Sequence, residues 1–218
     1  FILRTTKTEG YYGKYAIVNK KQFSINERNM YDLDSSNVSI ASQDAFLELE
    51  NTPIAYALGT KFIDSYICSQ SMSEILVTRE GMTTGNNELF LKLWYEVDFT
   101  KFGRKWFPYN KGGSYRKWYG NDEYLVNWEN DGIDIKNNKD TETGRIRSHN
   151  YNGEYAFREG ITWSAFSSKG ATFRYSSSQF LFDSKGSKGF CNKEYLLYIL
   201  SFLNSSVGQQ YLSYFAGA

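Results

Sequence analysis

The chain has little proline, cysteine or histidine: 2 Pro, 2 Cys and 1 His among 218 residues. Cys68 and Cys191 are too few for a disulfide framework, and neither lies in a CxxC or other metal-ligand spacing. We therefore expect two buried, reduced thiols. His149 lies in a polar segment without an evident nucleophile, so a solvated histidine is expected rather than a catalytic base. The sequence offers no ligand set for zinc and no predicted metal site.

Long apolar runs and the common phosphate-binding motifs are also missing. No run is long enough to span a membrane, and the beginning shows no signal-peptide pattern, so we expect a cytoplasmic protein without a membrane partner. Neither GxxxxGK[ST] nor GxGxxG occurs. The net charge is only +1, so any attraction to nucleic acid must come from charges segregated on one surface.

Aromatic residues, by contrast, are abundant at 18% of the chain. Rings at this density favour strands and stacking surfaces, so the sequence predicts an α+β fold with short, mostly antiparallel strands and packed helices. Helices are expected after Ser42, from Thr52-Pro53, and over residues 194–215 with a break at 204–206. Strands are expected at residues 1–4, 11–18, 38–40, 161–167, 171–175 and 179–182.

The stretch of residues 104–128 combines cations, rings and glycines. Its cations suit phosphates and base edges, its rings suit stacking, and its glycines let the backbone approach a ligand. The same composition also fits a solvated hairpin whose lysine and arginine stems cover tyrosine faces. Likewise, the polar loop of residues 81–87 suits a plain turn as well as a phosphate or base contact.

Two other classes fit parts of the sequence. Asp122, Asp134 and Lys136 imitate the spaced carboxylates and lysine of a metal-dependent nuclease, although such a loose pattern often arises by chance. Glycan binding would use tryptophans as stacking platforms, but the five cations between residues 104 and 117 exceed what neutral sugars require. The candidate sugar platforms are Trp106, Trp118, Trp128 and Trp163.

Several motifs in the middle of the chain occur in the same order as the motifs of a known protein family. Gly81-Met82-Thr83-Thr84-Gly85-Asn86-Asn87, followed by Phe90 and Trp94-Tyr95-Glu96-Val97, resembles the G-x-x-T-G-D-N…F…W-x-E-V signature of PglX-type adenine-specific DNA methyltransferases of BREX phage-exclusion systems. Further blocks at 105–113, 116–121, 127–132, 159–164, 180–183 and 203–205 follow in order. The resemblance covers roughly residue 50 to the end. Asn86 departs from the family's usual Asp, which removes a charge from the expected DNA side.

The resemblance implies a target-recognition region rather than a catalytic one. Such a region is also found in related type II restriction-modification methyltransferases. The family's catalytic part binds S-adenosylmethionine and holds the flipped adenine with an Asn-Pro-Pro-Tyr type motif. Neither that motif nor a convincing cofactor loop occurs here, so we expect no catalytic residue and no cofactor site in this chain. Because the chain begins with Phe1, we expect it to be a piece of a larger protein. Residues 81–218 would form the recognition domain with C-terminal helices, and residues 1–80 a strand and helix segment, either a partial lobe or part of the same sheet.

By this resemblance the chain binds double-stranded DNA. We expect Lys101, Arg104, Lys105, Lys111, Arg116 and Lys117 to contact phosphates, with one or two arginines recognising guanine edges. Thr84, Gly85, Asn86, Asn87 and Asn121 are candidate polar contacts to bases, with Gly112, Gly113 and Tyr119 beside them. The main alternative is a protein-interaction module that docks another phage-defence protein or a phage inhibitor.

Overall fold

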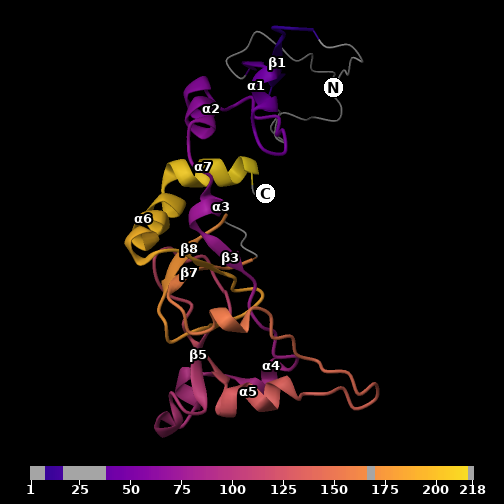
Figure 1. The fold of residues 1–218 in the computed structure, drawn as a ribbon, viewed down its shortest axis with the longest axis vertical. Helices are drawn as coiled ribbons and strands as arrows, with labels where there is room; N and C mark the ends of the chain where they lie inside the picture. The colour runs from indigo at the N-terminus through magenta and orange to yellow at the C-terminus, as the bar shows by residue number, and fades with distance from the viewer. Residues whose placement is uncertain (1–7, 17–37, 166–169, 216–218) are drawn as a thin grey trace, which may run out of the picture. The chain divides into compact units, whose positions relative to one another are not determined.

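The computed structural model describes residues 8–16, 38–165 and 170–215. Contacts divide the chain into a first unit, Phe1–Gln70 with Tyr214–Gly217, and a second unit, Ser71–Ser213 (Figure 1). The assignment of residues 81–218 as a recognition domain stays a prediction. No helix in the described ranges has both the length and the hydropathy that a membrane crossing requires.

The first unit is a small two-stranded sheet with short helices. β1 (Tyr12–Ala16) pairs antiparallel with β2 (Val38–Ser42), and α1 (Asp44–Leu47) follows directly. These elements confirm the strands expected at 11–18 and 38–40, as far as they are described, and the short helix after Ser42. The strand expected at 1–4 lies outside the described residues. The core of this unit contains Phe46, Leu49, Ala55, Leu58 and Ile63.

The helix predicted to begin at Thr52-Pro53 is wrong. The helix of this region, α2, is Thr60–Ile67, with Gly59 as its N-cap. Thr52 has φ of 46°, in the left-handed region, whereas an N-cap residue has an extended backbone. The spacing of Ala55 and Leu58 fits one face of a helix, but these buried side chains reach the core from a segment without helical structure.

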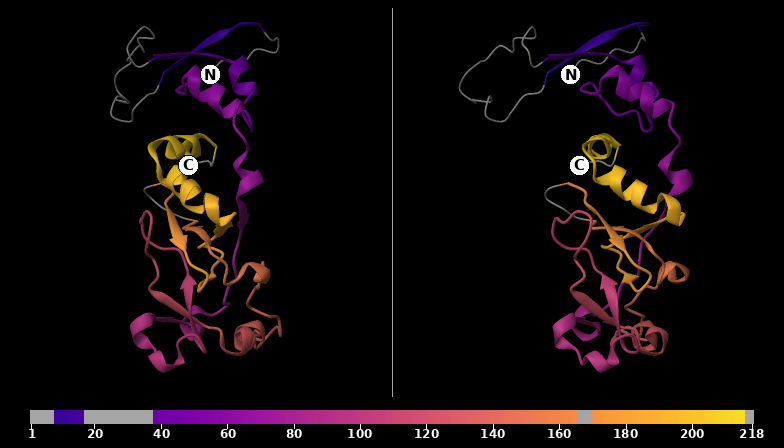
Figure 2. Two further views of the ribbon diagram at one scale, coloured as in Figure 1. Left: turned by 60° about the vertical axis from the view of Figure 1, so that its left-hand side comes forward. Right: turned by 90° about the vertical axis from the view of Figure 1, so that its left-hand side faces the viewer.

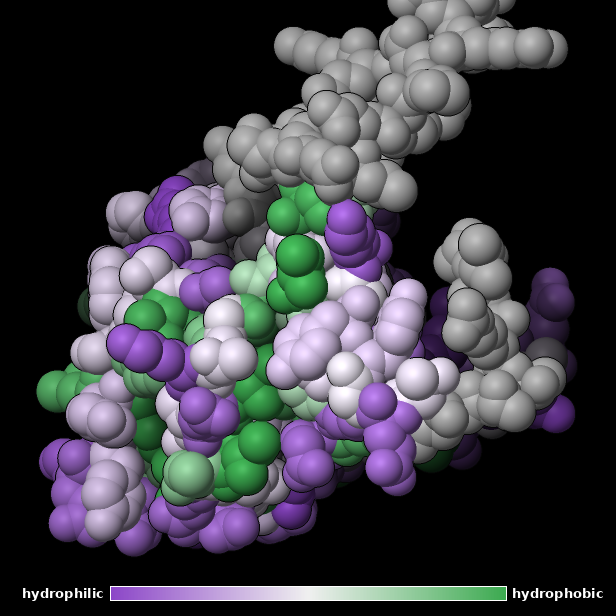
Figure 3. All heavy atoms as spheres, turned by 90° about the horizontal axis from the view of Figure 1, so that it is seen from above, coloured by the Kyte–Doolittle hydropathy of each residue, from purple (hydrophilic) through white to green (hydrophobic). Residues whose placement is uncertain are grey.

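Some apolar side chains remain on the surface. Figure 3 shows apolar residues in separate patches among polar ones on one face of the molecule. In the first unit, Ile40, Leu47 and Ile54 are all exposed. Scattered exposed apolar residues are normal in folded proteins, so they carry no functional argument by themselves.

One sheet of the second unit is antiparallel throughout. It contains β3 (Val77–Arg79), β10 (Lys188–Phe190), β7 (Gly160–Trp163) and β8 (Phe173–Ser176), in that order. The helix α6 (Lys193–Asn204) lies beside β7 and β8 (Figures 1 and 2). One face of α6 packs against the sheet and the short helix α3 (Met72–Ile75). The core between them contains Leu76, Ile161, Phe173, Leu196, Ile199, Leu200 and Leu203.

The other sheet of this unit has the order β4, β6, β5, β9. Its strands are β4 (Leu91–Leu93), β6 (Tyr124–Asn127), β5 (Trp106–Asn110) and β9 (Leu181–Phe182), and only the β5–β9 pair is parallel. The helices α4 (Asn87–Phe90) and α5 (Glu129–Lys136) adjoin it, with short 3₁₀ turns η2 (Trp94–Glu96), η3 (Phe99–Lys101) and η4 (Gly153–Tyr155). Its core contains Tyr109, Val126, Trp128, Ile135 and Leu181.

The predicted α+β class is confirmed, with strands that are mostly antiparallel. The strands expected near 161–167, 171–175 and 179–182 are β7, β8 and β9. The predicted break in the C-terminal helices is also confirmed, because α6 ends at Asn204 and α7 (Ser206–Phe215) begins two residues later.

The expectation of two buried thiols is wrong. Cys68 is exposed and Cys191 is only half-buried. Cys68 lies at the C-cap of α2, and Cys191 lies between β10 and α6, so both fall where a regular element ends at the surface. Partial burial raises the pKa of the Cys191 thiol, with a smaller contribution from the charge of Glu159.

Candidate nucleic-acid interface

The chain passes repeatedly between the two sheets of the second unit, and these crossings meet at one place. β3 leads to β4 through Met82, and β9 leads back to β10 through Asp183. Met82 forms a parallel bridge with Asp183, whose backbone N–H donates to the Asn110 carbonyl at 2.9 Å. The loop 81–87 and the segment after β5 are therefore held against the same turn.

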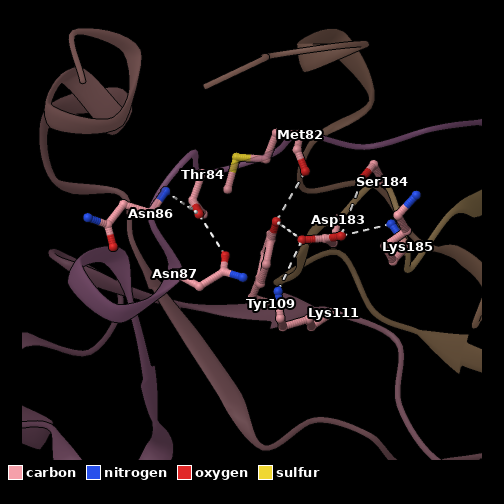
Figure 4. A network of polar contacts seen from close by, with 9 residues as sticks. All are labelled: Met82, Thr84, Asn86, Asn87, Tyr109, Lys111, Asp183, Ser184 and Lys185. Atoms are coloured by element: carbon pink, nitrogen blue, oxygen red, sulfur yellow. Dashed lines mark hydrogen bonds and ion pairs between the residues drawn. The ribbon is translucent and has the colours of Figure 1, made fainter. Parts of the chain in front are cut away.

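A buried carboxylate lies at the centre of this crossing (Figure 4). Asp183 is 5% exposed and accepts hydrogen bonds from the Tyr109 hydroxyl at 2.8 Å and the Lys185 backbone N–H at 2.7 Å. The Lys111 ammonium lies 3.6 Å from the same carboxylate. Burial, followed by the charge of Asp183, raises the pKa of Tyr109 well above its usual value. Lys111, predicted to contact phosphate, thus already compensates a buried negative charge.

Hydrogen bonds from its own side chains stabilise the loop 81–87. Thr84 is buried, its hydroxyl donates to Asn87 Oδ1 at 2.7 Å, and the backbone N–H of Asn86 donates to the same hydroxyl at 3.3 Å (Figure 4). Asn86 Oδ1 accepts from the Leu89 N–H at 3.1 Å and so caps α4. Asp caps helices as well as Asn does, so the cap itself does not require Asn at this position. In the described part of the chain, the amide nitrogen of exposed Asn87 has no hydrogen-bond partner.

The segment 147–152 packs against the loop 81–87 and is hydrogen-bonded to it. Thr83 and His149 exchange backbone hydrogen bonds of 2.8 and 3.1 Å, and Asn152 Nδ2 donates to the Glu80 carbonyl at 2.9 Å. Gly85, with φ of 70°, lies so near Arg147 that a Cβ would be 2.6 Å from its carbonyl carbon. Glycine is therefore required there for both backbone conformation and space.

His149 is exposed, as expected, and its ring stacks on Tyr151 with centroids 5.4 Å apart. This exposed pair lies beside the predicted loop, because His149 is bonded to Thr83. Sequence reasoning missed it, since a lone histidine in a polar segment gives no sign of which strand it will pair with.

The six predicted cations do not form one patch. Lys101, Arg104 and Lys105 precede β5, whereas Lys111, Arg116 and Lys117 follow it. A five-residue strand advances roughly 16 Å, so the two groups lie at opposite ends of β5.

Most of these cations have partners within the fold. Lys105 pairs with Glu129 at 2.9 Å, Arg116 pairs with Glu123 at 3.3 Å, and Lys117 Nζ donates to the Asn204 carbonyl at 2.9 Å, at the C-terminal end of α6. A lysine at this end of a helix donates to a carbonyl that has no partner within the helix, and its positive charge interacts favourably with the helix dipole.

Lys101 and Arg104 differ from the other four predicted cations, which are Lys105, Lys111, Arg116 and Lys117. Both are exposed, and neither side chain forms an ion pair or hydrogen bond within the described ranges. They are therefore the predicted cations whose charge is most available to an incoming polyanion.

The loop between β5 and β6 is tied to the other sheet. Ser164 Oγ accepts from the Gly113 N–H at 3.0 Å and donates to the Gly113 carbonyl at 3.1 Å. Trp118 adds to the edge of β8, because its N–H donates to Phe173 O at 2.9 Å and its carbonyl accepts from Tyr175 N–H at 3.0 Å. Tyr119, 75% exposed, lies just beyond this attachment.

Two further predicted residues of this loop have structural roles. Buried Asn121 donates to the Ser114 carbonyl at 2.9 Å. Gly112, with φ of 82°, passes so close to the Lys185 carbonyl that a Cβ would lie 2.8 Å from its oxygen.

Arg174 of β8 lies beneath this loop and is 1% exposed. Its Nη1 donates to the Arg116 carbonyl at 3.3 Å and its Nη2 to Ser164 Oγ at 3.2 Å, while its Nε has no partner. Burial lowers the pKa of Arg174, and the charge of Asp122 opposes this. Burial also raises the pKa of the Asp122 carboxyl, with Glu123 adding to the effect. Sequence reasoning missed Arg174, because an arginine in a strand pattern ordinarily faces water.

The other chemical candidates find little support. Asp134 lies on α5, Asp122 precedes β6, and Lys136 forms its ion pair with Asp131. The described residues contain no group of three potential metal-ligating His, Cys, Asp or Glu side chains. Of the candidate sugar platforms, Trp128 is buried in a core and Trp163 packs against one.

Comparison with known proteins extends the motif resemblance to nearly the whole chain. No protein-family model matches. The chain is 42% identical over 230 residues to the adenine-specific methyltransferase PglX of Lacticaseibacillus casei (strain Zhang), covering 97% of this chain and 19% of that protein. It is 38% identical over 184 residues to the adenine-specific methyltransferase BrxX of Escherichia coli O9:H4 (strain HS), covering 80% and 14%. Over this segment the chain is similar to PglX-type adenine-specific methyltransferases.

The resemblance stated from the motif blocks is thereby confirmed. The chain spans about a fifth or less of the length of these PglX-type relatives. The match to PglX covers 97% of this chain, so it also extends to residues before the expected start at residue 50. Both units therefore match sequence in that longer relative.

Proposed function

We propose that the second unit is the DNA target-recognition region of an adenine-N6 DNA methyltransferase of a BREX phage-defence system. The observation that carries this proposal is the loop 81–87, which is braced internally by Thr84 and from behind by residues 147–152. A braced loop presents exposed polar groups in one geometry, and a preorganised surface loses little entropy on binding. Similarity to adenine-specific methyltransferases supports DNA as the partner.

The contacts divide into two kinds. Phosphate contacts position a protein on the duplex, whereas contacts to base edges choose the sequence. Lys101 and Arg104 suit the first role because neither side chain forms a hydrogen bond or an ion pair in the described fold. Asn87 suits the second, because an asparagine amide can pair with an adenine edge. Arg116, half of whose side chain is exposed, is the predicted arginine best placed to exchange its surface partner Glu123 for a guanine.

Methyl transfer would belong to another part of the whole protein. S-adenosylmethionine would supply the methyl group, and the target adenine would be turned out of the duplex. The chain contains neither an Asn-Pro-Pro-Tyr motif nor a Gly-rich cofactor loop, so none of its residues is assigned to that cofactor. This chain would contribute affinity for DNA and the choice of the DNA sequence.

The phosphate role predicts a change in salt dependence. Each phosphate contact contributes about 0.9 to the slope of log K against log salt concentration. The variant Lys101→Ala/Arg104→Ala should therefore flatten the slope for duplex DNA by about 1.8 in the full-length protein. Fluorescence anisotropy over a salt series measures this slope, and thermal unfolding checks that the fold is unchanged.

The matched control is Lys193→Ala, which removes one exposed charge at the start of α6. It should leave the slope unchanged. An unaltered slope in the double variant would contradict the proposal that these residues contact phosphate. Lys111→Ala is a poorer test, because it also removes the cation beside buried Asp183.

A second candidate, a protein-interaction module, is favoured by the exposed rings Tyr115, Trp118 and Tyr119. Large rings with polar edges are enriched at protein interfaces. A stable complex with another phage-defence protein that persists in the Lys101→Ala/Arg104→Ala variant, without any DNA binding by the wild type, would favour this alternative.

A further inference from the structure

Two arginines outside the predicted basic stretch meet on one tyrosine ring. Arg79 ends β3, Tyr155 ends η4, and Arg158 follows three residues later. The guanidinium carbons of Arg79 and Arg158 lie 4.8 and 5.2 Å from the centre of the Tyr155 ring. Arg79 is further fixed by hydrogen bonds to the Tyr155 hydroxyl at 3.2 Å and to the Thr78 carbonyl at 2.9 Å.

The charges of this pair are not neutralised within the fold. Neither Arg79 nor Arg158 forms an ion pair with any carboxylate in the described ranges. The neighbouring Glu159 instead accepts a hydrogen bond from the Tyr175 hydroxyl at 2.7 Å. Two like charges on one ring repel each other, and an anion bound between or beside them would remove that cost.

The chemistry of the pair favours phosphate. A guanidinium presents a planar fork of donors that matches phosphate oxygens, and a guanidinium already held on a ring loses less freedom on binding. The adjacent cavity of about 450 Å³ is a poorer place for an anion, because Glu74 and Glu159 also line it.

We propose that Arg79 and Arg158, held on Tyr155, bind a backbone phosphate of the DNA that the loop 81–87 recognises. This assignment rests on the proposed function and adds a second anchoring point to it. It would explain why a tyrosine and two arginines without ion pairs in the described residues lie together beside the start of the loop.

The position of the pair relative to the loop is compatible with one duplex. Arg79 precedes Thr84 by five residues, which span at most about 18 Å of extended chain. B-DNA advances about 3.4 Å per base pair, so both contacts would lie within about five base pairs along the axis. The segment carrying Tyr155 is attached to the loop strand, because Asn152 donates to Glu80 O and also accepts from the Tyr155 N–H at 2.9 Å.

The test measures duplex binding by the full-length protein over a salt series. Arg79→Ala and Arg158→Ala should each weaken binding about tenfold at low salt, as expected for one charge-assisted contact. Each should also flatten the salt slope, by up to about 0.9. Arg79→Lys and Arg158→Lys should retain more of the slope but lose affinity, because lysine keeps the charge without the fork. Tyr155→Phe, which keeps the ring, should change the slope little.

The outcomes separate this inference from the proposed function. If Lys101→Ala/Arg104→Ala flattens the slope but the Arg79 and Arg158 variants do not, the second anchor is wrong and the recognition role stands. If none of these variants changes the slope, or the protein does not bind duplex DNA, both are wrong. An equal loss in Lys193→Ala would show a general effect of charge and would overturn the second anchor. Circular dichroism and thermal unfolding must show that each variant is folded, and the Lys variants decide the case if an Ala variant is not.

Discussion

Replacing Arg174 by alanine should lower the free energy of unfolding by about 3 to 5 kcal/mol, the cost of breaking a buried charged network. Its guanidinium donates to the Arg116 carbonyl and to Ser164 Oγ, and Ser164 in turn holds Gly113. Without it the loop 111–121 loses its side-chain support from β8 and keeps only the backbone hydrogen bonds of Trp118, and a large buried side chain leaves a cavity. The loop should therefore become accessible while much of the sheet still folds.

Urea denaturation gives the stability change, and limited trypsin digestion reports on the loop, which contains Lys111, Arg116 and Lys117. Cleavage after these residues should accelerate in the variant. Arg145→Ala, at an exposed arginine without an ion pair in the described residues, should have little effect on either measurement. Stability and cleavage equal to the wild type would show that Arg174 does not support the loop.

Replacing Lys188 by methionine should stabilise the protein and weaken the dependence of its stability on pH. Lys188 is 0% exposed on β10, and its ammonium donates to the Ser177 carbonyl at 3.3 Å. Burial lowers its pKa to about 7, an effect that the charge of Glu159 partly opposes. In the unfolded chain a lysine titrates near 10.4.

The sign of this pH dependence follows from the number of protons that the folded and the unfolded protein bind. Between about pH 7 and 10.4 the unfolded chain binds the proton that the folded protein has lost, so this lysine makes stability rise with pH, by up to about 1.4 kcal/mol per unit. Below about pH 7 the folded protein must bury a charged ammonium. Lys188→Met should therefore gain most at low pH, on the order of 5 kcal/mol near pH 6.

Urea denaturation at pH 6, 7.5 and 9 measures this difference. The gain of Lys188→Met over the wild type should shrink as the pH rises. Lys193→Met, at an exposed lysine, should follow the wild type at each pH. A constant difference between Lys188→Met and the wild type would contradict the lowered pKa.

The elements that the sequence predicted well are those with a local signal. Helical spacing and the polar break at 204–206 identified α6 and α7, and apolar clusters between glycine and serine turns identified β7, β8 and β9. By contrast, β5 was hidden in the basic stretch, because Trp106, Pro108 and Tyr109 were equally consistent with a ligand-binding segment. Only pairing with β6 and β9 decides that this stretch contains a sheet strand.

The candidate site shows the same limit. The sequence identified the loop 81–87 and the cations, but it could not show which cations already have partners. Lys111 meets Asp183 and Lys117 meets the end of α6 only after the chain has crossed between sheets. Arg79 and Arg158 were missed for the same reason, since their shared ring, Tyr155, is a neighbour in space of both but in sequence only of Arg158.

The most direct test of the central proposal exchanges the second unit within the full-length protein. Residues 71–213 would be replaced by the matching segment of a PglX-type relative that methylates a different DNA sequence, and methylated adenines would be mapped across the genome of cells that express the chimaera. The account predicts that methylation moves to the donor's sequence. Continued methylation of the original sequence by an active chimaera would contradict it.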